Sequence, residues 1–429
     1  MSLCHAKHYD LVIIGAGMVG ASLACILDKA SLKRSQKDNS QQERPLKILL
    51  VESAPVDLDA SPAQPSFDAR TTVLSYGTVE YLRKQGFLQA IEGSAETISR
   101  IHVSDQGRLG SAWISSEEQG VEALGYVIEN HLLGRQFNQV LSVANSIELC
   151  HSVKVSALIP GASGMAVQLD NGNEQEEITT ELVVLAEGGR SGLCEKLGIH
   201  RNSESYNQSA IIANVAFTNS HDNVAYERFT PNGPLALLPL PDIDNEHRAA
   251  LVWTQKSNES EALLNLSDSE FLGLLQQAFG NRVGDFTRVG QRHSYPLNLI
   301  KAEEQVRPGL VLLGNVAHSL HPVAGQGFNL AYRDTMRLAE LLIETANSDS
   351  PLGDIAMLHR YQQSTENDQD KTAAFSHYIT RLFSTGNPAA VWARKFGLFS
   401  IDLVLPLRRA FAKRAMGMSD RQVQLVDAG

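Results

Sequence analysis

Cysteine is scarce in this chain of 429 residues, and its four cysteines are far apart in the sequence. Cys4, Cys25, Cys150 and Cys194 form no Cys-x-x-Cys pair and lie at no spacing from histidine that suits zinc. A dense disulfide framework and a zinc module are therefore excluded, and a reducing, cytoplasmic environment is expected.

Positive charge is also in short supply. The chain has 37 Lys and Arg residues against 48 Asp and Glu residues, so its formal net charge is −11. This balance argues against a surface built to bind nucleic-acid phosphates, although local basic patches remain possible. We expect no nucleic-acid partner.

Long uninterrupted hydrophobic runs are missing as well. The apolar stretch from Leu11 to Leu27 is broken by Gly15, Gly17 and Gly20, which favours a strand, a turn and a helix over a membrane span. Asp10 precedes the first apolar run and no small-residue cleavage site follows it, so no signal peptide is expected.

The turn at Gly15–Gly20 fits the pattern GxGxxG in the context that this pattern requires. It follows a buried-type strand from Leu11 to Ile14 and opens a helix that extends from Val19 to about Ala30. The first glycine permits a tight turn, Gly17 lets a pyrophosphate approach the backbone, and the third allows close packing of helix and strand. The pattern predicts a dinucleotide site; a purely structural glycine turn is the alternative.

An acidic residue completes this unit at the end of a second apolar strand, Lys47–Val51. Glu52 lies 32 positions after Gly20, whereas the usual spacing is about 20. The polar stretch Ser31–Arg44 has no periodicity, and we expect it to be an inserted loop that accounts for the difference. This unit alone does not distinguish FAD from NAD.

Further strands indicate two kinds of sheet. Leu182–Ala186 and Leu310–Leu313 are apolar runs typical of a buried parallel sheet, and a helix is expected from about Phe328 to Thr345. Three other strands have no long helix between them and predict an antiparallel sheet in a second domain: Ile211–Phe217, Leu235–Leu240 and Arg248–Trp253.

The predicted fold class is therefore α/β, with a Rossmann-type nucleotide-binding domain interleaved with an antiparallel-sheet substrate domain and followed by C-terminal helices. A content of 43% hydrophobic residues over this length supplies core for two or three domains. The predicted boundaries are 1–75, 125–200 and 290–345 for the nucleotide-binding domain, 76–124 and 201–289 for the substrate domain, and 346–429 for the helical segment.

A second glycine-rich segment, Gly309–Asp334, follows a strand and leads into a helix. Glycines there let backbone N–H groups approach a flat ligand, and the helix N-terminus favours negative charge on a reduced flavin ring. His318 and His321 are three residues apart, but no nearby carboxylate or third histidine completes a metal site. We expect hydrogen-bonding or packing roles for both histidines and no metal.

At this point the sequence resembles the flavin-dependent aromatic hydroxylases of the para-hydroxybenzoate hydroxylase fold, and among them the ubiquinone-biosynthesis hydroxylases. The resemblance covers nearly the whole chain. The motifs that carry it are GAGMVG at Gly15–Gly20, FDART at Phe67–Thr71, LAEGGRSGL at Leu185–Leu193 and GNVAHSLHPVAGQGFNLAYRD at Gly314–Asp334. The segments Tyr226–Leu240, Tyr295–Leu297 and Arg360–Gln363 look most like the 2-polyprenyl-6-methoxyphenol hydroxylase branch.

The resemblance implies FAD as the cofactor and assigns expected roles to individual residues. Gly15, Gly17 and Gly20 would hold the pyrophosphate, and Glu52 the adenosine ribose. Arg70 would lie beside the flavin ring; a solvated surface arginine is the alternative. The residues that would contact the ribityl chain or line the isoalloxazine are Gly314, Asn315, Pro322, Gly325, Gln326, Gly327 and Asn329.

Two positions depart from the family pattern. The middle motif commonly has Asp-Gly, then Ser, then a basic residue, whereas this chain has Glu187-Gly188, Ser191 and Cys194. The arginine that usually contacts FAD from a helix has no clear counterpart, since His131 is near its expected place and Arg135 lies one turn later. Arg135 is retained as a weaker candidate for cofactor binding.

The implied chemistry is hydroxylation of a polyprenylated methoxyphenol by O2 through a flavin C4a-hydroperoxide, with NAD(P)H as a transient reductant. Because the cofactor performs the difficult step, no Ser/His/Asp set or carboxylate pair is expected. The protein must orient the substrate and exclude water. Only one dinucleotide fingerprint is present, so the reductant has no Rossmann domain of its own.

The C-terminal stretch Pro388–Met418 is apolar and basic, with six Lys or Arg residues against one acid, Asp402. Such a segment suits contact with an anionic membrane surface, including the inner face of the cytoplasmic membrane, or with other ubiquinone-biosynthesis proteins. A pair of helices packed on the core is the alternative, and both descriptions can hold together.

The sequence also leaves other functions open. A sister hydroxylase would act on a different ring carbon, and a flavoprotein scaffold would bind FAD without catalysis. A flavin halogenase or dehydrogenase of similar fold is a further alternative. A halogenase needs a WxWxIP-type signature, whereas Trp113, Trp253 and Trp392 are far apart in this chain.

Overall fold

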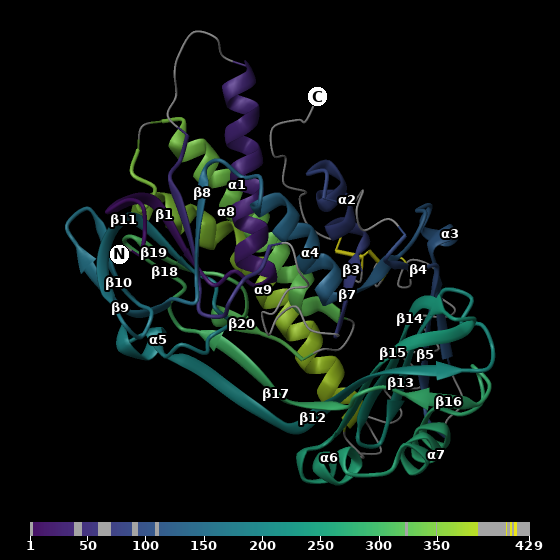
Figure 1. The fold of residues 1–429 in the computed structure, drawn as a ribbon. Helices are drawn as coiled ribbons and strands as arrows, with labels where there is room; N and C mark the ends of the chain where they lie inside the picture. Colours follow the sequence, from purple (N-terminus) through teal and green to yellow (C-terminus); the bar gives the residue numbers. More distant parts are fainter. Residues whose placement is uncertain are drawn as a thin grey trace.

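A computed structural model describes residues 3–37, 45–58, 70–87, 93–107, 111–321, 325–348, 350–384, 409, 412–413 and 416–417. A mainly parallel sheet lies in one half of the molecule, and a sheet that is antiparallel except for the parallel pair of its strands β5 and β13 lies in the other (Figure 1). The α/β class predicted from the sequence is confirmed.

The first sheet has eight strands in the order β18-β19-β11-β1-β2-β8, with β10 and β9 extending from β11. Strands β19, β11, β1, β2 and β8 are parallel to one another, and the others pair antiparallel. The strands are β18 Val306–Arg307, β19 Leu310–Leu312, β11 Gln175–Leu185, β1 His8–Ile14, β2 Ile48–Glu52, β8 Ile147–His151, β10 Gly164–Asp170 and β9 Lys154–Gly161.

Alternate side chains of the parallel strands serve two hydrophobic cores, as the two-residue period of a strand requires. Leu11 and Ile13 belong to the core beneath the helices, whereas Val12 and Ile14 belong to the core on the other face. Four helices lie on the first face: α1 Met18–Lys37, α4 Asn130–Leu141, α8 Gln326–Ala346 and α9 Ile355–Ser384 (Figure 1). The short helix α5, Leu193–Lys196, lies on the second.

The second sheet has nine strands in the order β20-β17-β12-β15-β14-β13-β5-β6, with β16 also paired to β12. Its strands are β20 His318–Ser319, β17 His293–Ala302, β12 Arg201–Phe217, β15 Glu246–Lys256, β14 Gly233–Ile243, β13 Val224–Thr230, β5 Arg100–Asp105, β6 Ser111–Ser115 and β16 Phe286–Val289. The predicted antiparallel pairing of the three central strands is confirmed.

Helices α6, Ser257–Leu264, and α7, Asp268–Phe279, cover one face of this second sheet. Phe271 and Phe279 of α7 are buried there together with Trp253 of β15. The opposite face of the sheet is turned toward the parallel sheet and is left for the site described below.

A small three-stranded sheet in the order β3-β7-β4 completes the fold. It consists of β3 Thr71–Ser75, β7 Gly125–Glu129 and β4 Glu96–Ile98, with the helices α2 Tyr76–Lys84 and α3 Ser116–Gln119 nearby (Figure 1). Strand β3 also contacts the N-terminal part of α8, so it connects the two halves of the molecule.

One expectation from the sequence needs correction. The stretch predicted to be a loop from Ser31 is helical as far as Lys37, because its Lys, Arg and Gln residues are good helix formers and continue α1. Residues 38–44 lie outside the described residues. Strand β17 pairs with β12 of the nine-stranded sheet. The predicted domain boundaries, which assign residues from 290 to the nucleotide-binding domain, stay a prediction.

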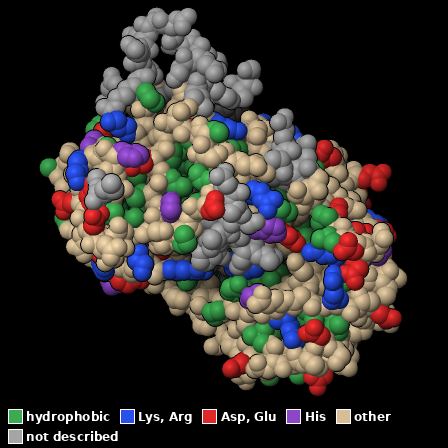
Figure 2. Space-filling view, in the orientation of Figure 1, with side chains coloured by type: hydrophobic (Ala, Val, Ile, Leu, Met, Phe, Trp, Pro, Cys, Tyr) green, Lys and Arg blue, Asp and Glu red, His purple; other side chains and the backbone are tan. Residues whose placement is uncertain are grey.

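Further observations concern the surface, the helices and the C-terminal region. Figure 2 shows acidic and basic side chains interspersed over one face of the molecule. Within the described ranges, every helix is too short or too polar to cross a bilayer. Most of the basic segment predicted at 388–418 lies outside the part of the chain that the structure describes.

Candidate functional site

A cavity of about 1190 Å³ lies between the carboxyl ends of the parallel strands and the inner face of the nine-stranded sheet. The ends of β1 and β2 line one part of it, and strands β5, β13, β14 and β15 line another. Ligand pockets commonly measure roughly 300–1,000 Å³. This cavity is therefore large enough for an extended ligand together with a second molecule.

The turn after β1 can only be built with glycine. Gly15 has a φ of +102°, and a Cβ atom there would lie 2.8 Å from the Ala186 carbonyl oxygen. A Cβ on Gly20 would lie 1.9 Å from the Gly15 carbonyl oxygen, so α1 packs directly against the turn. Gly15 and Gly17 line the cavity, whereas Gly20 lies behind them and keeps the turn compact.

The predicted acid is tied to the same turn. One carboxylate oxygen of Glu52 accepts a hydrogen bond from the Ala16 N–H at 2.8 Å, and the other accepts one from the Ala54 N–H at 2.9 Å. Glu52 is 8% exposed and lines the cavity at the end of β2. The structure thus brings together the strand, the glycines and the acid of the predicted fingerprint.

Arg70 lies in the cavity wall just before β3, so the alternative of a surface arginine does not describe its position. Its guanidinium carbon is 4.7 Å from the centre of the Tyr295 ring, which belongs to β17 of the other sheet. A guanidinium held by an aromatic ring is fixed in orientation. Of the FDART motif, the structure describes Arg70 and Thr71, because residues 67–69 lie outside the described residues.

The second glycine segment forms the opposite wall. Asn315, in the 3-10 turn Gly314–Val316, lines the cavity together with Gly325 and Gly327. Gly314 has a φ of +73° and faces Val19 of α1, where a Cβ atom would lie 3.1 Å from a Val19 methyl carbon. Gly314 therefore lets its turn pack closely against the start of α1, and it does not line the cavity itself.

Gln326 and Asn329, which were expected to line the cofactor ring, lie behind this wall. Asn329 is fully buried; its amide nitrogen donates to the carbonyl oxygens of Val73 and Gly325, each at 2.8 Å. Its amide oxygen accepts a hydrogen bond from the Ser75 N–H at 2.8 Å. Asn329 thus joins β3 to the start of α8, and it positions Gly325 rather than contacting the cavity.

Two other candidates are not placed at the cavity. Arg135 is exposed on α4 and does not line it. Pro322 lies outside the described residues, so its expected place near the ring stays a prediction.

The altered middle motif does reach the cavity. Glu187, Gly188, Arg190 and Ser191 line it, and the Glu187 carboxylate accepts hydrogen bonds from the N–H groups of Arg190 and Ser191 at 2.6 and 3.0 Å. Cys194, at the position of the family's basic residue, is 2% exposed, and burial raises the pKa of its thiol to about 11. A buried neutral thiol does not replace a cation at the cavity surface.

The two histidines near the second glycine segment have internal partners. The Nε2 atom of His318 is 2.7 Å from the Asp334 carboxylate, which also accepts a hydrogen bond from Gln369. His321 is buried with its ring edge-on to Tyr206, and burial lowers its pKa to about 4. These contacts match the hydrogen-bonding and packing roles that were expected.

Sequence reasoning missed several cavity residues. Asn130 begins α4 and accepts a hydrogen bond from the Thr72 hydroxyl at 2.7 Å, and both residues line the cavity. Glu227 of β13 and Thr254 of β15 line the sheet side. The position of Asn130 directly after β7 could have identified it as a candidate. Nothing in the sequence around Glu227 distinguishes it from a strand glutamate that faces solvent.

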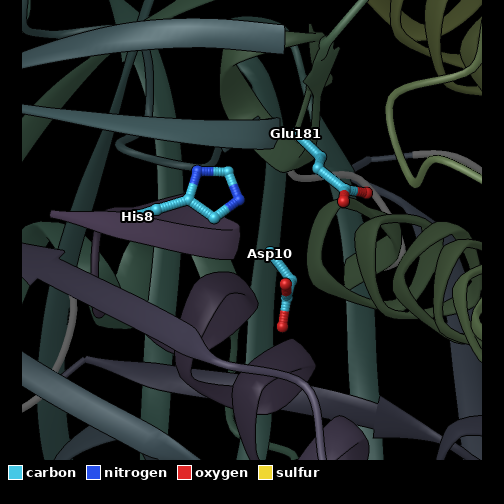
Figure 3. Close-up of side chains that lie close together, drawn as sticks. All are labelled: His8, Asp10 and Glu181. Carbon is cyan, nitrogen blue, oxygen red and sulfur yellow. The ribbon is translucent and has the colours of Figure 1, made fainter. Parts of the chain in front are cut away.

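A separate cluster of possible metal ligands lies elsewhere. His8, Asp10 and Glu181 have ligand atoms within 4.8 Å of one another (Figure 3). Asp10 and Glu181 already accept hydrogen bonds from the N–H groups of Lys47 and Leu352, and His8 bonds to the Thr179 hydroxyl. His8 begins β1, so the cluster is at the opposite end of that strand from Gly15 and is not part of the candidate site.

The residues at the cavity fit a bound dinucleotide. The backbone at Gly15 leaves no room for a side chain, and the N-terminus of α1 follows at Met18 with unpaired N–H donors. A second turn with positive φ, at Gly314, faces the first across Val19. An elongated ligand with a phosphate bridge suits this arrangement, with an apolar compartment beyond it.

Comparison with known proteins agrees with this description. The family described as "FAD binding domain" matches residues 8–369. The chain is 32% identical to the ubiquinone hydroxylase UbiL of Rhodospirillum rubrum, over 96% of this chain and 90% of that protein. It is 27% identical to the 3-demethoxyubiquinol 3-hydroxylase of Escherichia coli, over 95% of this chain and 98% of that protein.

Solved structures share the fold. The p-nitrophenol 4-monooxygenase PnpA of Pseudomonas putida superposes with a TM-score of 0.74 at 16% identity, covering 97% of this chain and all of that one. The Pseudomonas aeruginosa protein PqsL, solved in complex with 2-aminobenzoylacetate, gives a TM-score of 0.72 at 20% identity, over 92% of this chain and all of that one.

Proposed function

The chain belongs to the FAD-binding domain family, and from this premise we propose that it hydroxylates the ring of a polyprenylated methoxyphenol in ubiquinone biosynthesis. It is an FAD-dependent aromatic monooxygenase. The observation that carries the proposal is a single cavity that contains both the glycine turns and an apolar sheet face. Such a cavity would hold the cofactor and the substrate side by side.

The cofactor is assigned to the end of the cavity nearest the parallel sheet. Gly15, Gly17 and Glu52 would hold its adenosine and pyrophosphate part, and Asn315, Gly325 and Gly327 its flavin part. Arg70, fixed against Tyr295, would donate hydrogen bonds at the ring. Bound FAD supplies electron transfer from NAD(P)H and activation of O2. The residues of this chain orient the substrate beside it and keep the compartment dry.

The substrate is assigned to the end of the cavity formed by the nine-stranded sheet. Ile101, Ile114, Ala225, Leu238 and Ile212 make this wall apolar, which suits an aromatic ring with a hydrocarbon chain. The named activities of the UbiL and Escherichia coli relatives support a quinone-type substrate. The Escherichia coli relative is named for position 3 of the ring, whereas the name of the UbiL relative gives no position, so the ring carbon that is hydroxylated is not assigned.

We also propose that the protein associates peripherally with the membrane that contains its substrate. Ala412 and Met416 are buried and line the cavity, whereas Arg409 and Lys413, four residues apart, are exposed. The described residues of the C-terminal segment thus include two that pack on the core and two basic residues that can meet anionic lipid. A lipid-facing tail beside the cavity would give a prenylated substrate a short route in.

The function is tested with the purified FAD-loaded enzyme and in the host. We expect a prenylated methoxyphenol to stimulate NAD(P)H oxidation with formation of a hydroxylated product, and deletion of the gene to cause a prenylphenol to accumulate. A flavoprotein scaffold would bind FAD without either effect. Normal ubiquinone levels in the deletion strain, without a precursor, would contradict the proposed pathway.

A further inference from the structure

Glu227 is a carboxyl group in the middle of an apolar sheet face. Strand pairing places it opposite Ala236 of β14 and Val103 of β5. Ala236 is in turn paired with Val252, and Val103 with Ala112. Since paired residues project from the same side of a sheet, these five side chains form one transverse row that lines the cavity.

No other charged residue of the nine-stranded sheet lines the cavity, within the described part of the chain. The neighbours of Glu227 two positions away on β13, Ala225 and Phe229, are apolar and line the cavity as well. Among the described residues, no side chain or backbone group forms a hydrogen bond or ion pair with the Glu227 carboxyl group.

An unpartnered carboxyl group in such surroundings costs folding free energy. Burial alone raises the pKa of Glu227 to about 7. Its remaining exposure is toward the cavity, because the rest of its surroundings are the sheet itself. A hydrophobic side chain would pack there at lower cost, so the group points to a ligand that supplies the missing partner.

We infer that the Glu227 carboxylate accepts a hydrogen bond from a hydroxyl group on the aromatic ring of the substrate. The inference rests on the proposed function and adds a specificity-determining residue to it. A phenol donates this hydrogen bond and its methyl ether does not, so Glu227 would select the free phenol. The contact would also orient the ring and increase its electron density for attack on oxygen.

The test compares two probes that differ in one methyl group. The full-length FAD-loaded protein is titrated with 2-allyl-6-methoxyphenol and with its methyl ether, 1-allyl-2,3-dimethoxybenzene, and binding is followed by the visible absorbance of the flavin. We expect the wild-type protein to bind the phenol about tenfold or more tightly than the ether, as a buried hydrogen bond to a charged group allows.

Two variants at Glu227 should weaken the preference for the phenol to different degrees. Glu227→Gln keeps the volume and a neutral acceptor, so an intermediate preference is expected. Glu227→Leu removes the acceptor and completes the apolar row, so the phenol and the ether should bind almost equally, with the ether bound no more weakly than by the wild type. Glu177→Gln, which changes an exposed glutamate of β11, is the matched control and should keep the wild-type preference.

The outcomes separate the two claims. A wild-type preference retained by both Glu227 variants, or no preference in the wild type, would overturn the role of Glu227. If Glu227→Leu fails to fold, the ratio measured for Glu227→Gln decides in the same way. Failure of the wild-type enzyme to hydroxylate any prenylated phenol would instead contradict the proposed function.

Discussion

Single residues around the cavity divide into those that face it and those that hold it in shape. Asn315 and Asn329 illustrate the division, although both lie in one glycine-rich segment. Asn315 is exposed to the cavity, whereas the Asn329 amide is fully occupied by β3 and the start of α8. A side chain that satisfies three buried backbone groups is difficult to replace.

This contrast gives the first prediction. Asn329→Ala should lower the free energy of unfolding by on the order of 2–3 kcal/mol, because it leaves buried backbone groups without partners. Urea denaturation monitored by circular dichroism measures the loss. Asn315→Ala, as the comparison, should change stability little and weaken FAD retention instead. Equal stability of the two variants would contradict the division.

Single residues also show why parts of the site could not be predicted from the sequence. Glu52 was found because its position after an apolar strand is local information. Two of the three partners of Asn329 are 254 and 256 residues away, and nothing near it in the chain distinguishes it from a ligand-binding amide. Glu227 was missed because only strand pairing shows that its neighbours are apolar.

Among the secondary-structure elements, the buried parallel strands were the most predictable. Strands β1, β2, β11 and β19 are continuous apolar runs because both of their faces are covered, and each was located to within a few residues except for the polar first half of β11. The end of α1 was misjudged because its last turns are polar and show no periodicity. Strand β17 could not be assigned to its sheet, since that depends on pairing with β12 about ninety positions earlier.

The turn between β1 and α1 gives the second prediction. Gly15→Ala should abolish FAD binding, because the new Cβ atom would lie 2.8 Å from the Ala186 carbonyl oxygen at a φ that favours glycine. The flavin-to-protein absorbance ratio after purification measures retention.

Gly273→Ala is the control for this substitution. Gly273 is in α7, where an added Cβ atom meets nothing within 4 Å, so the variant should keep its FAD and gain up to about 1 kcal/mol of stability. A yellow Gly15→Ala protein with the flavin content of the wild type would show that the turn is not the cofactor site.

For the molecule as a whole, the cavity depends on parts that are distant in sequence. The parallel sheet, the antiparallel sheet, α9 and the last described residues of the chain all contribute to its lining. The cavity therefore belongs to none of the predicted domains alone. The domain boundaries themselves stay a prediction.

The C-terminal segment gives the third prediction. Replacing Arg409 and Lys413 together by Gln should reduce sedimentation with anionic liposomes several-fold, because each basic residue near such a surface contributes about 1 kcal/mol. Truncation after Asn387 should reduce it further. The double variant Lys47→Gln/Lys84→Gln, which removes two exposed charges elsewhere, should behave as the wild type. Unchanged partitioning of the tail variants would remove the membrane proposal.

The order of the parallel strands has a consequence for biosynthesis of the protein. Strand β1 is made first, yet its neighbour β11 emerges from the ribosome some 170 residues later, and β19 and α8 more than 100 residues after that. Until then the nascent chain has only one of the two glycine turns. Flavin loading must therefore be a late event, and a prematurely terminated polypeptide would be released colourless.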